Sequence, residues 1–205
     1  MNSTLKNKNI VIGITSSIAC YKVLELIKKL RKLRANVHVI MTKSATKLVD
    51  TKDFEKVSNN AVNIDLFNPN VDYKDYIKKN KSIRHISLAD SADLVLICPA
   101  TANIIGKIAY GIADDLLSTS IMATNAPVLI CPAMNVKMWK NSILQENVDK
   151  LRKLRYEFID PECGILACGY KGIGRLANLD RIVERIKATI ERRSDLKGKK
   201  ILVTA

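Results

Sequence analysis

Short, nearly continuous apolar runs alternate along this chain with longer segments in which apolar residues recur every three or four positions. The short runs have the length and the β-branched composition of strands buried on both faces of a parallel sheet. They occupy residues 9–15, 36–41, 93–98, 127–131 and 155–159.

The intervening segments have the periodicity of amphipathic helices. In the first of them Val23, Leu26 and Leu30 share one face, and Lys22 lies on the other. Helices are predicted over residues 16–34, 85–92, 103–110, 114–124, 138–153 and 178–192. Asp114 is the expected cap of the fourth. Strands that alternate with helices predict an α/β fold, a flavodoxin-like or Rossmann-like parallel sheet with helices on both faces.

Two segments interrupt this alternation. Residues 57–82 are polar and predict a loop with short elements, and residues 161–176 predict a loop rich in Gly and Cys. Residues 1–192 are expected to form one domain, followed at 193–205 by a linker and the first strand of a truncated second domain. A terminal edge strand of the same sheet explains residues 200–205 equally well.

The composition narrows the class of protein. The sequence has 205 residues, 47% of them hydrophobic and 26% charged, which excludes disorder along its whole length. No apolar run approaches the roughly 18 residues of a membrane-spanning helix, and the run at 10–14 is too short for a secretory signal. Five scattered cysteines, an odd number, predict a cytoplasmic protein with reduced thiols.

The net charge of +14 raises the question of a nucleic-acid partner. Only 5% of the residues are aromatic, so surfaces for base stacking are scarce. The basic clusters at 28–34 and 150–155 alternate with Leu on predicted helices, which favours solvated helix faces. We therefore expect no nucleic acid and no membrane partner, and a positive field that suits a small phosphorylated substrate.

Candidate chemistry gathers after the strands, because ligands of an open parallel sheet bind beyond the C-terminal ends of its strands. The first end carries Gly13-Ile-Thr-Ser-Ser17, whose hydroxyl and N–H groups can hold a phosphate. The Gly-x-Gly-x-x-Gly fingerprint of dinucleotide sites is absent, which favours a mononucleotide. Ordinary helix capping by Ser16 or Ser17 explains the segment equally well.

Two further strand ends carry small and polar residues. Pro99-Ala-Thr-Ala-Asn103 and Pro132-Ala-Met-Asn135 each follow a predicted strand directly. Their small residues allow a flat ligand to approach the backbone, and Asn103 offers both a donor and an acceptor to a heterocycle. A strand-to-helix turn explains either segment alone, but two of them at one sheet edge favour a binding site.

The segment 164–174 holds four glycines in 11 residues and predicts a mobile loop that closes over a ligand. Cys168 stands in it between Ala and Gly, where a thiol is exposed and reactive. No zinc site is expected, because Cys163 and Cys168 have no second ligand pair at suitable spacing. His85 is the candidate general acid or base, whereas His38 lies within a strand and is interpreted as structural.

Together these segments resemble the homo-oligomeric flavin-containing cysteine decarboxylases over about residues 8–190. The most specific pieces are Pro132-Ala-Met-Asn135 with Met138-Trp139, and the Cys168 loop with Gly172-Ile-Gly-Arg175. His85-Ile-Ser-Leu88 is similar to the histidine segment of that family. Thr101 replaces Ser in its Pro-Ala-Ser-Ala-Asn motif.

The resemblance implies FMN as the cofactor, in agreement with the missing dinucleotide fingerprint. The residues implied for FMN are Gly13, Ser16, Ser17, Thr42, Ser44, Thr101, Ala102, Asn103 and Ala133. Those implied for the substrate are Met134, Asn135, Leu166 and Ala167, and those implied for catalysis are His85 and Cys168. The resemblance also implies flavin sites between subunits of a trimer, or of a dodecamer built from trimers, and a ligase domain in bifunctional members.

The implied reaction is decarboxylation of phosphopantothenoylcysteine in coenzyme A biosynthesis. Flavin-dependent oxidation of the cysteine to a thioaldehyde supplies the electron sink that loss of CO2 needs, and the enethiol formed is then reduced. By resemblance, His85 transfers a proton in the oxidative half, Asn135 binds the carboxylate and Cys168 protonates in the reductive half. Two alternatives stay open: a flavin-dependent decarboxylase acting on a peptidyl cysteine, and a non-catalytic flavin-binding regulatory protein.

Overall fold

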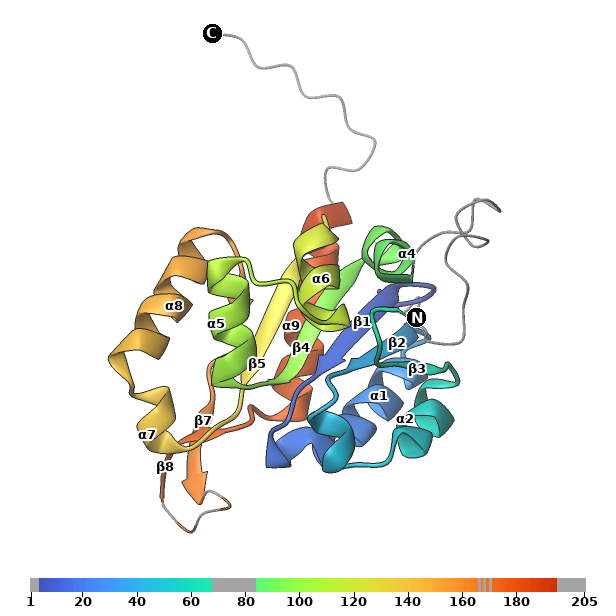
Figure 1. The fold of residues 1–205 in the computed structure, drawn as a ribbon. Helices are drawn as coiled ribbons and strands as arrows, with labels where there is room; N and C mark the ends of the chain where they lie inside the picture. The colour runs from blue at the N-terminus through green and yellow to red at the C-terminus, as the bar shows by residue number, and fades with distance from the viewer. Residues whose placement is uncertain (1–3, 68–83, 166, 168, 170, 195–205) are drawn as a thin grey trace, which may run out of the picture.

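A six-stranded parallel sheet forms the centre of the computed structural model, which describes residues 4–67, 84–165, 167, 169 and 171–194 (Figure 1). Its strands are β1 Asn9–Ile14, β2 Asn36–Met41, β3 Val62–Asn63, β4 Leu94–Ala100, β5 Val128–Pro132 and β6 Glu157–Phe158. They lie in the order β3-β2-β1-β4-β5-β6. The chain builds outward from β1 on one side and then from β4 on the other, so the order reverses between β1 and β4, where open sheets bind ligands.

Helices cover both faces of this sheet, as the sequence predicts (Figure 1). Their bounds are η1 Ile18–Lys22, α1 Val23–Lys32, η2 Ala45–Lys47, α2 Thr51–Ser58, α4 Arg84–Ser91, α5 Ala102–Tyr110, α6 Leu116–Ala123, α7 Val136–Trp139, α8 Ser142–Lys153 and α9 Leu179–Ser194. Side chains of α1, α2 and α9 share one buried cluster, and those of α4, α5, α6 and α8 share the other. None of the helices in the described part of the chain is long and apolar enough to cross a membrane.

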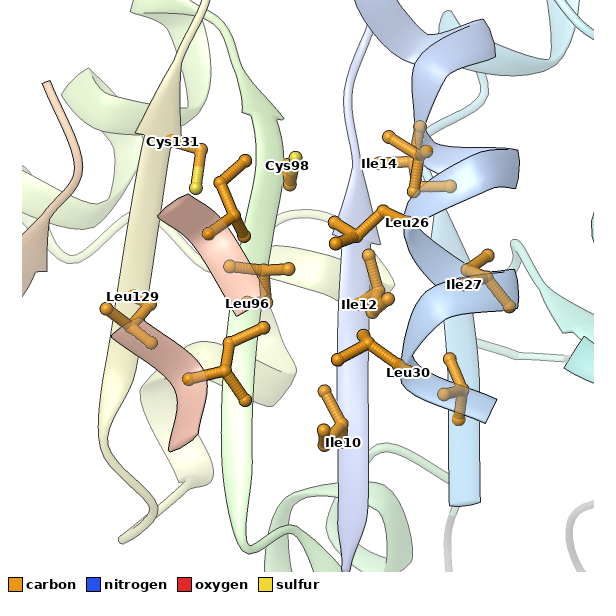
Figure 2. Packing of buried hydrophobic residues seen from close by; sticks show 14 of the residues in the cluster. Ile10, Ile12, Ile14, Leu26, Ile27, Leu30, Leu96, Cys98, Leu129 and Cys131 are labelled. Carbon is orange, nitrogen blue, oxygen red and sulfur yellow. The ribbon is translucent and has the colours of Figure 1, made fainter. Parts of the chain in front are cut away.

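The alternation of side chains along β1 builds both clusters. Ile10 and Ile12 are fully buried on the side of Leu26 and Leu30 of α1 (Figure 2). Val11 belongs to the other buried cluster. A strand with apolar residues at consecutive positions is therefore buried on both faces, as expected of a central parallel strand.

The expected Gly-rich loop at 161–176 is wrong in part, because two strands pair within it. Strands β7 (Glu162–Ile165) and β8 (Lys171–Arg175) form an antiparallel hairpin. Glycine has a low strand propensity and no side chain to pack, so the pattern of this segment carries no strand signal.

Two helix predictions also need correction. The expected helix at 138–153 is interrupted, because Asn141 caps α8 by accepting a hydrogen bond from the Ile143 amide at 3.0 Å. The expected cap Asp114 is displaced by its neighbour: Asp115 accepts from the Ser118 amide at 2.8 Å and forms a capping box with it.

The polar segment predicted as a loop at 57–82 begins with the end of α2 and the short strand β3. Residues 68–82 of that segment lie outside the described residues, and so does 195–205 of the predicted linker and strand. Strand β4 ends two residues later than predicted and includes Pro99 and Ala100.

Of the described cysteines, Cys20, Cys98 and Cys131 are buried, Cys163 is exposed, and none forms a disulfide. Burial, assisted by a hydrogen bond with Cys98, raises the pKa of the Cys131 thiol. Such buried, protonated thiols fill the core and are unreactive. His38 is half-buried in β2, and burial lowers its pKa, in line with a structural histidine.

Candidate active site

Two of the pockets that the described residues form lie at the C-terminal edge of the sheet, where the strand order reverses. The larger, here the Met134 pocket, has a volume of about 540 Å³ and is lined by Ser17, Met134, Asn135, Ile165 and Arg175, among others. The smaller, here the Ser44 pocket, has about 260 Å³ and is lined by Thr42, Ser44, Asn103, Lys107 and Asp115, among others. Ser16 and Thr101 line both pockets and form the ridge between them.

The ridge is held together by the buried hydroxyl of Thr15, at the end of β1. Its Oγ1 donates a hydrogen bond to the Pro99 carbonyl at 2.8 Å and accepts one from the Thr101 amide at 3.0 Å. The two bonds join the ends of β1 and β4, and Thr15 is only 3% exposed. The hydroxyl therefore fixes the backbone of the ridge on which both pockets depend.

Thr101 is the N-cap residue of α5, but its side chain makes no capping hydrogen bond. Its amide donates to Thr15, and the residue lines both pockets. Ser17 behaves differently, because its Oγ accepts from the Ala19 amide and caps η1. Ser16, which has no such role, is exposed at the ridge.

The wall of the Met134 pocket is built from the end of β5 and from the hairpin. Asn135 caps α7, since its Oδ1 accepts a hydrogen bond from the Lys137 amide at 2.8 Å. The Met134 amide donates to the Gly174 carbonyl at 3.0 Å and so joins β8 to this segment. Ala133 and Ala167 also line the pocket.

Two glycines of the hairpin allow this close approach. A Cβ at Gly174 would lie 2.1 Å from the Met134 carbonyl oxygen, and the residue has a φ of +151°. A Cβ at Gly172 would lie 2.9 Å from a methyl group of Val136. These glycines are therefore required for packing against 134–136, and the part of the predicted mobile loop that β8 occupies is a docked strand.

The two candidate catalytic residues are not brought together within the described part of the chain. Cys168 and Leu166 lie outside the described residues, although Ala167 between them lines the Met134 pocket. His85 belongs by its backbone to the first turn of α4, and its side chain also lies outside the description. Figure 1 places α4 at the opposite end of the sheet from the β7–β8 hairpin.

The Ser44 pocket carries several charged side chains that pair with one another. Lys107 Nζ lies 2.6 Å from an Asp114 oxygen and 2.8 Å from an Asp115 oxygen. Lys43 pairs with Asp65 at 3.0 Å on the exposed rim. Among the described residues of this pocket, every charged side chain thus has an opposite charge as partner.

The pKa values at this cluster follow from burial and pairing. Burial alone raises the pKa of Asp115, but hydrogen bonds from Lys107 and Ser118 outweigh it, so this pKa lies below its ordinary value. Burial alone lowers the pKa of Lys107, but the bonds to Asp114 and Asp115 outweigh it and raise this pKa. Lys107 and Asp115 are therefore both charged at neutral pH.

Gly13 and Ala102, both expected at the cofactor, are not among the described residues that line either pocket. Gly13 lies in β1, where a Cβ would stand 2.4 Å from a methyl carbon of Leu117. Leu117 itself lines the Ser44 pocket, so Gly13 shapes that pocket by leaving room for this side chain. Thr42 and Ser44 line the same pocket, and Thr42 Oγ1 accepts from the Ala45 amide at 3.3 Å.

The structure adds to the pockets several residues to which the sequence assigned no site role. Lys22, Tyr21 and Arg175 line the Met134 pocket, and Lys107 and Asp115 line the other. Lys22 lies in the segment that follows the first strand, and Asp115 adjoins the expected cap Asp114, so both had a local signal. The sequence pattern does not place Arg175 next to the segment after β1, because the hairpin that positions Arg175 was not predicted.

Comparison with known proteins matches the flavoprotein family to residues 1–191. The coenzyme A biosynthesis bifunctional protein CoaBC of Borreliella burgdorferi is 43% identical over 98% of this chain and 49% of its own length. The probable phosphopantothenoylcysteine decarboxylase of Streptococcus mutans is 36% identical over 88% of this chain and 97% of its own. The chain spans about half the length of the CoaBC relatives that it matches.

Solved structures share the fold over nearly the whole chain. A PPC decarboxylase mutant complexed with pantothenoylaminoethenethiol has a TM-score of 0.79 and 27% identity, covering 91% of this chain and 100% of that one. The FMN-dependent cysteine decarboxylase SpaF has a TM-score of 0.78 and 28% identity, covering 93% and 99%. These similarities confirm the predicted flavodoxin-like α/β fold.

Proposed function

The chain belongs to the flavoprotein family, and from this premise we propose that it is an FMN-dependent phosphopantothenoylcysteine decarboxylase of coenzyme A biosynthesis. The observation that carries the proposal is the construction of the Met134 pocket. One wall is the Pro132–Asn135 segment, docked on the hairpin whose connection contains Cys168, and the other is the Ser16–Thr101 ridge. A substrate would thus contact the ridge and the Asn135 wall at once.

The donor set of the ridge fits a flavin mononucleotide. The hydroxyls of Ser16 and Thr101 and the small side chain of Ala133 border a pocket with room for a flat ring, and the adjoining pocket adds Ser44 and Asn103. When bound, FMN supplies reversible hydride acceptance, which gives the substrate carbon the electron sink that loss of CO2 requires. The protein has to orient the substrate and move its protons.

Within this proposal, Asn135 donates hydrogen bonds to the substrate carboxylate and Cys168 protonates the decarboxylated product. Met134, Leu166 and Ala167 hold the substrate chain against the ridge. His85 takes up the proton released during oxidation. Since α4 lies at the far end of the sheet from the hairpin, we infer that this histidine serves the pocket of a neighbouring subunit (Figure 1).

A homo-oligomer, as a trimer or a dodecamer of trimers, is therefore part of the proposal, in the cytoplasm. It is supported by exposed apolar side chains at the rim of the Met134 pocket, which a second subunit would cover. These side chains are Ile18, Tyr21, Met138 and Ile165.

The test uses the purified chain loaded with FMN and the substrate phosphopantothenoylcysteine. We expect release of CO2 and formation of phosphopantetheine, detected by mass. Asn135→Asp should lower kcat/KM by about 100-fold or more, since a carboxylate replaces the amide donor and repels the substrate. Asp also caps helices well, so flavin content and stability should stay at the wild-type level.

Three outcomes would contradict the proposal. Wild-type protein that binds FMN but releases no CO2 would refute the decarboxylase function. Asn135→Asp with wild-type kcat/KM would remove Asn135 from substrate binding. Cys168→Ser should release CO2 but accumulate the oxidised enethiol, and normal formation of the reduced product by this variant would exclude Cys168 as the proton donor.

A further inference from the structure

Two cations line the Met134 pocket, and the acidic residues closest to them line the adjoining cavity rather than this one. Lys22, at the end of η1, is half-buried, and Arg175, at the end of β8, is exposed. None of the described residues that line this pocket is Asp or Glu. The pocket wall therefore carries a local charge of two positive groups.

Three acidic residues, Glu25, Glu162 and Asp180, line an adjoining cavity together with Lys22 and Arg175, and each has another partner. Glu25 and Asp180 both pair with Lys29, at 3.7 Å and 2.7 Å. Glu162 accepts a hydrogen bond from the Asn178 amide at 2.9 Å. Within the described residues, neither Lys22 nor Arg175 takes part in an ion pair, so their charges are available to a ligand.

The position of Arg175 follows from the hairpin. In the register of β7 and β8 it stands opposite Glu162, whose carboxylate accepts a hydrogen bond from the Asn178 amide and forms no ion pair with Arg175 among the described residues. The Arg175 side chain instead lies across Gly164, where a Cβ would be 3.2 Å from its Cδ and 3.5 Å from a guanidinium nitrogen. The missing side chain at Gly164 gives the guanidinium its path toward the pocket.

We propose that Lys22 and Arg175 form a binding site for a phosphate monoester, the one carried by the substrate of the proposed function on which this inference rests. A guanidinium and an ammonium match a dianion by charge and by donor number. Asn135, on the same pocket, is neutral and suits the single charge of a carboxylate. The pocket thus distinguishes the two ends of a substrate that carries a carboxylate at one end and a phosphate at the other.

The test measures how strongly the enzyme prefers the phosphorylated substrate. We expect Lys22→Met and Arg175→Met each to lower kcat/KM for phosphopantothenoylcysteine about tenfold, and the double variant about 100-fold. Turnover of pantothenoylcysteine, which lacks the phosphate, should change less than about twofold. Lys28→Met removes the same charge from an exposed position of α1 outside both pockets and should leave the preference intact.

Two conservative variants test the geometry. Lys22→Arg keeps the charge and should retain most of the preference. Gly164→Ala keeps Arg175 but crowds its side chain, and a smaller loss than that of Arg175→Met is expected. A preference that persists in the double variant would overturn the proposal.

Binding of phosphopantothenate and pantothenate, measured by calorimetry on the FMN-loaded protein, separates this inference from the proposed reaction. The two probes differ only by the phosphate, and neither has a cysteine to lose CO2. A preference for phosphopantothenate that disappears in the double variant supports the site even where no CO2 is released. Equal wild-type affinity for both probes would overturn it.

The cofactor carries a phosphate monoester as well, so FMN and riboflavin are compared in the same variants. We expect the preference for FMN over riboflavin to be unchanged, because the cations serve the substrate. A double variant that binds FMN only as well as riboflavin would assign Lys22 and Arg175 to the cofactor and refute the substrate site.

Discussion

The two pockets share a ridge but differ in whether their charged side chains are paired. In the Ser44 pocket Lys107 lies between two carboxylates, and every charged side chain among the described lining residues has a partner of opposite sign. In the Met134 pocket Lys22 and Arg175 have no such partner among the described residues. Paired charges hold elements of the fold together, whereas unpaired charges at a pocket wall are free to select a ligand.

The largest effect on substrate binding is expected from a substitution that detaches the hairpin from the wall of the Met134 pocket and leaves the Ser44 pocket intact. Gly174→Ala introduces a Cβ at 2.1 Å from the Met134 carbonyl oxygen at a φ of +151°. Backbone strain costs roughly 1–3 kcal/mol at such a position, and the clash adds to it. We expect the hairpin to undock and KM for the substrate to rise more than tenfold, with FMN affinity unchanged.

Hydrogen exchange of the Met134 amide, which donates to the Gly174 carbonyl, measures this undocking directly. Gly169→Ala is the matched control, because that glycine also has a positive φ but a Cβ there would meet no described atom within 4 Å. Wild-type protection of the Met134 amide in Gly174→Ala would show that the hairpin docks without this glycine.

The next largest effect, on stability and FMN binding, is expected from removing the hydroxyl that holds the shared ridge together. Thr15→Val removes a hydroxyl that bonds the Pro99 carbonyl and the Thr101 amide. Leaving both groups buried without a partner should lower the free energy of unfolding by about 2–3 kcal/mol and weaken FMN binding. Chemical denaturation and flavin titration measure the two quantities.

Thr15→Ser keeps the hydroxyl and should stay within about 1 kcal/mol of the wild type, since only a methyl group is lost. Equal stability of the Val and Ser variants would mean that the ridge does not depend on these two hydrogen bonds.

The smallest effect, on the free energy of unfolding, is expected from breaking the ion pairs of the Ser44 pocket. Lys107→Met leaves Asp114 and Asp115 without their cation and should lower the free energy of unfolding by about 1–2 kcal/mol at neutral pH. Lys43→Met breaks the exposed pair with Asp65 in the same pocket and should have almost no effect. Comparable losses in both variants would show that burial of the pair does not matter.

The pH dependence of Lys107→Met has a defined sign. The pKa of Asp115 is lowered in the folded protein, so its pairing stabilises above the unfolded pKa near about 4 and is lost as the pH falls through the folded pKa. The wild type should therefore lose stability on acidification faster than Lys107→Met, in denaturation curves between about pH 5 and pH 2. An equal loss of stability with falling pH in the two proteins would show that the Lys107 pair does not lower the pKa of Asp115.

The sheet and the edge that carries the pockets could be predicted from the sequence because central parallel strands are continuous apolar runs. The segments after β1, β4 and β5 then had to meet at one edge, and Ser16, Thr101 and Asn135 do line pockets there. The position of these residues at the sheet edge thus followed from the local sequence pattern and from general rules of sheet topology.

The wall formed by the hairpin could not be predicted in the same way. Gly172 and Gly174 are needed by the backbone of residues 134–136, more than 30 residues earlier in the chain, and no local pattern records that contact. The break between α7 and α8 did have a local signal in Asn141, which is a preferred N-cap residue. Arg175 belongs to a motif of the sequence, but its position at the pocket wall depends on the hairpin, which was not predicted.

The two pockets also draw on different stretches of the polypeptide. The described residues lining the Ser44 pocket all precede residue 118, whereas those lining the Met134 pocket, apart from 16–22 and the ridge, all follow residue 132. Apart from Lys22 and the ridge, the residues proposed to contact the substrate therefore lie in one stretch of the chain that begins where β5 ends. Replacing the stretch after residue 132 would therefore exchange Asn135 and Arg175 together while keeping Ser16, Thr101 and Lys22 in place.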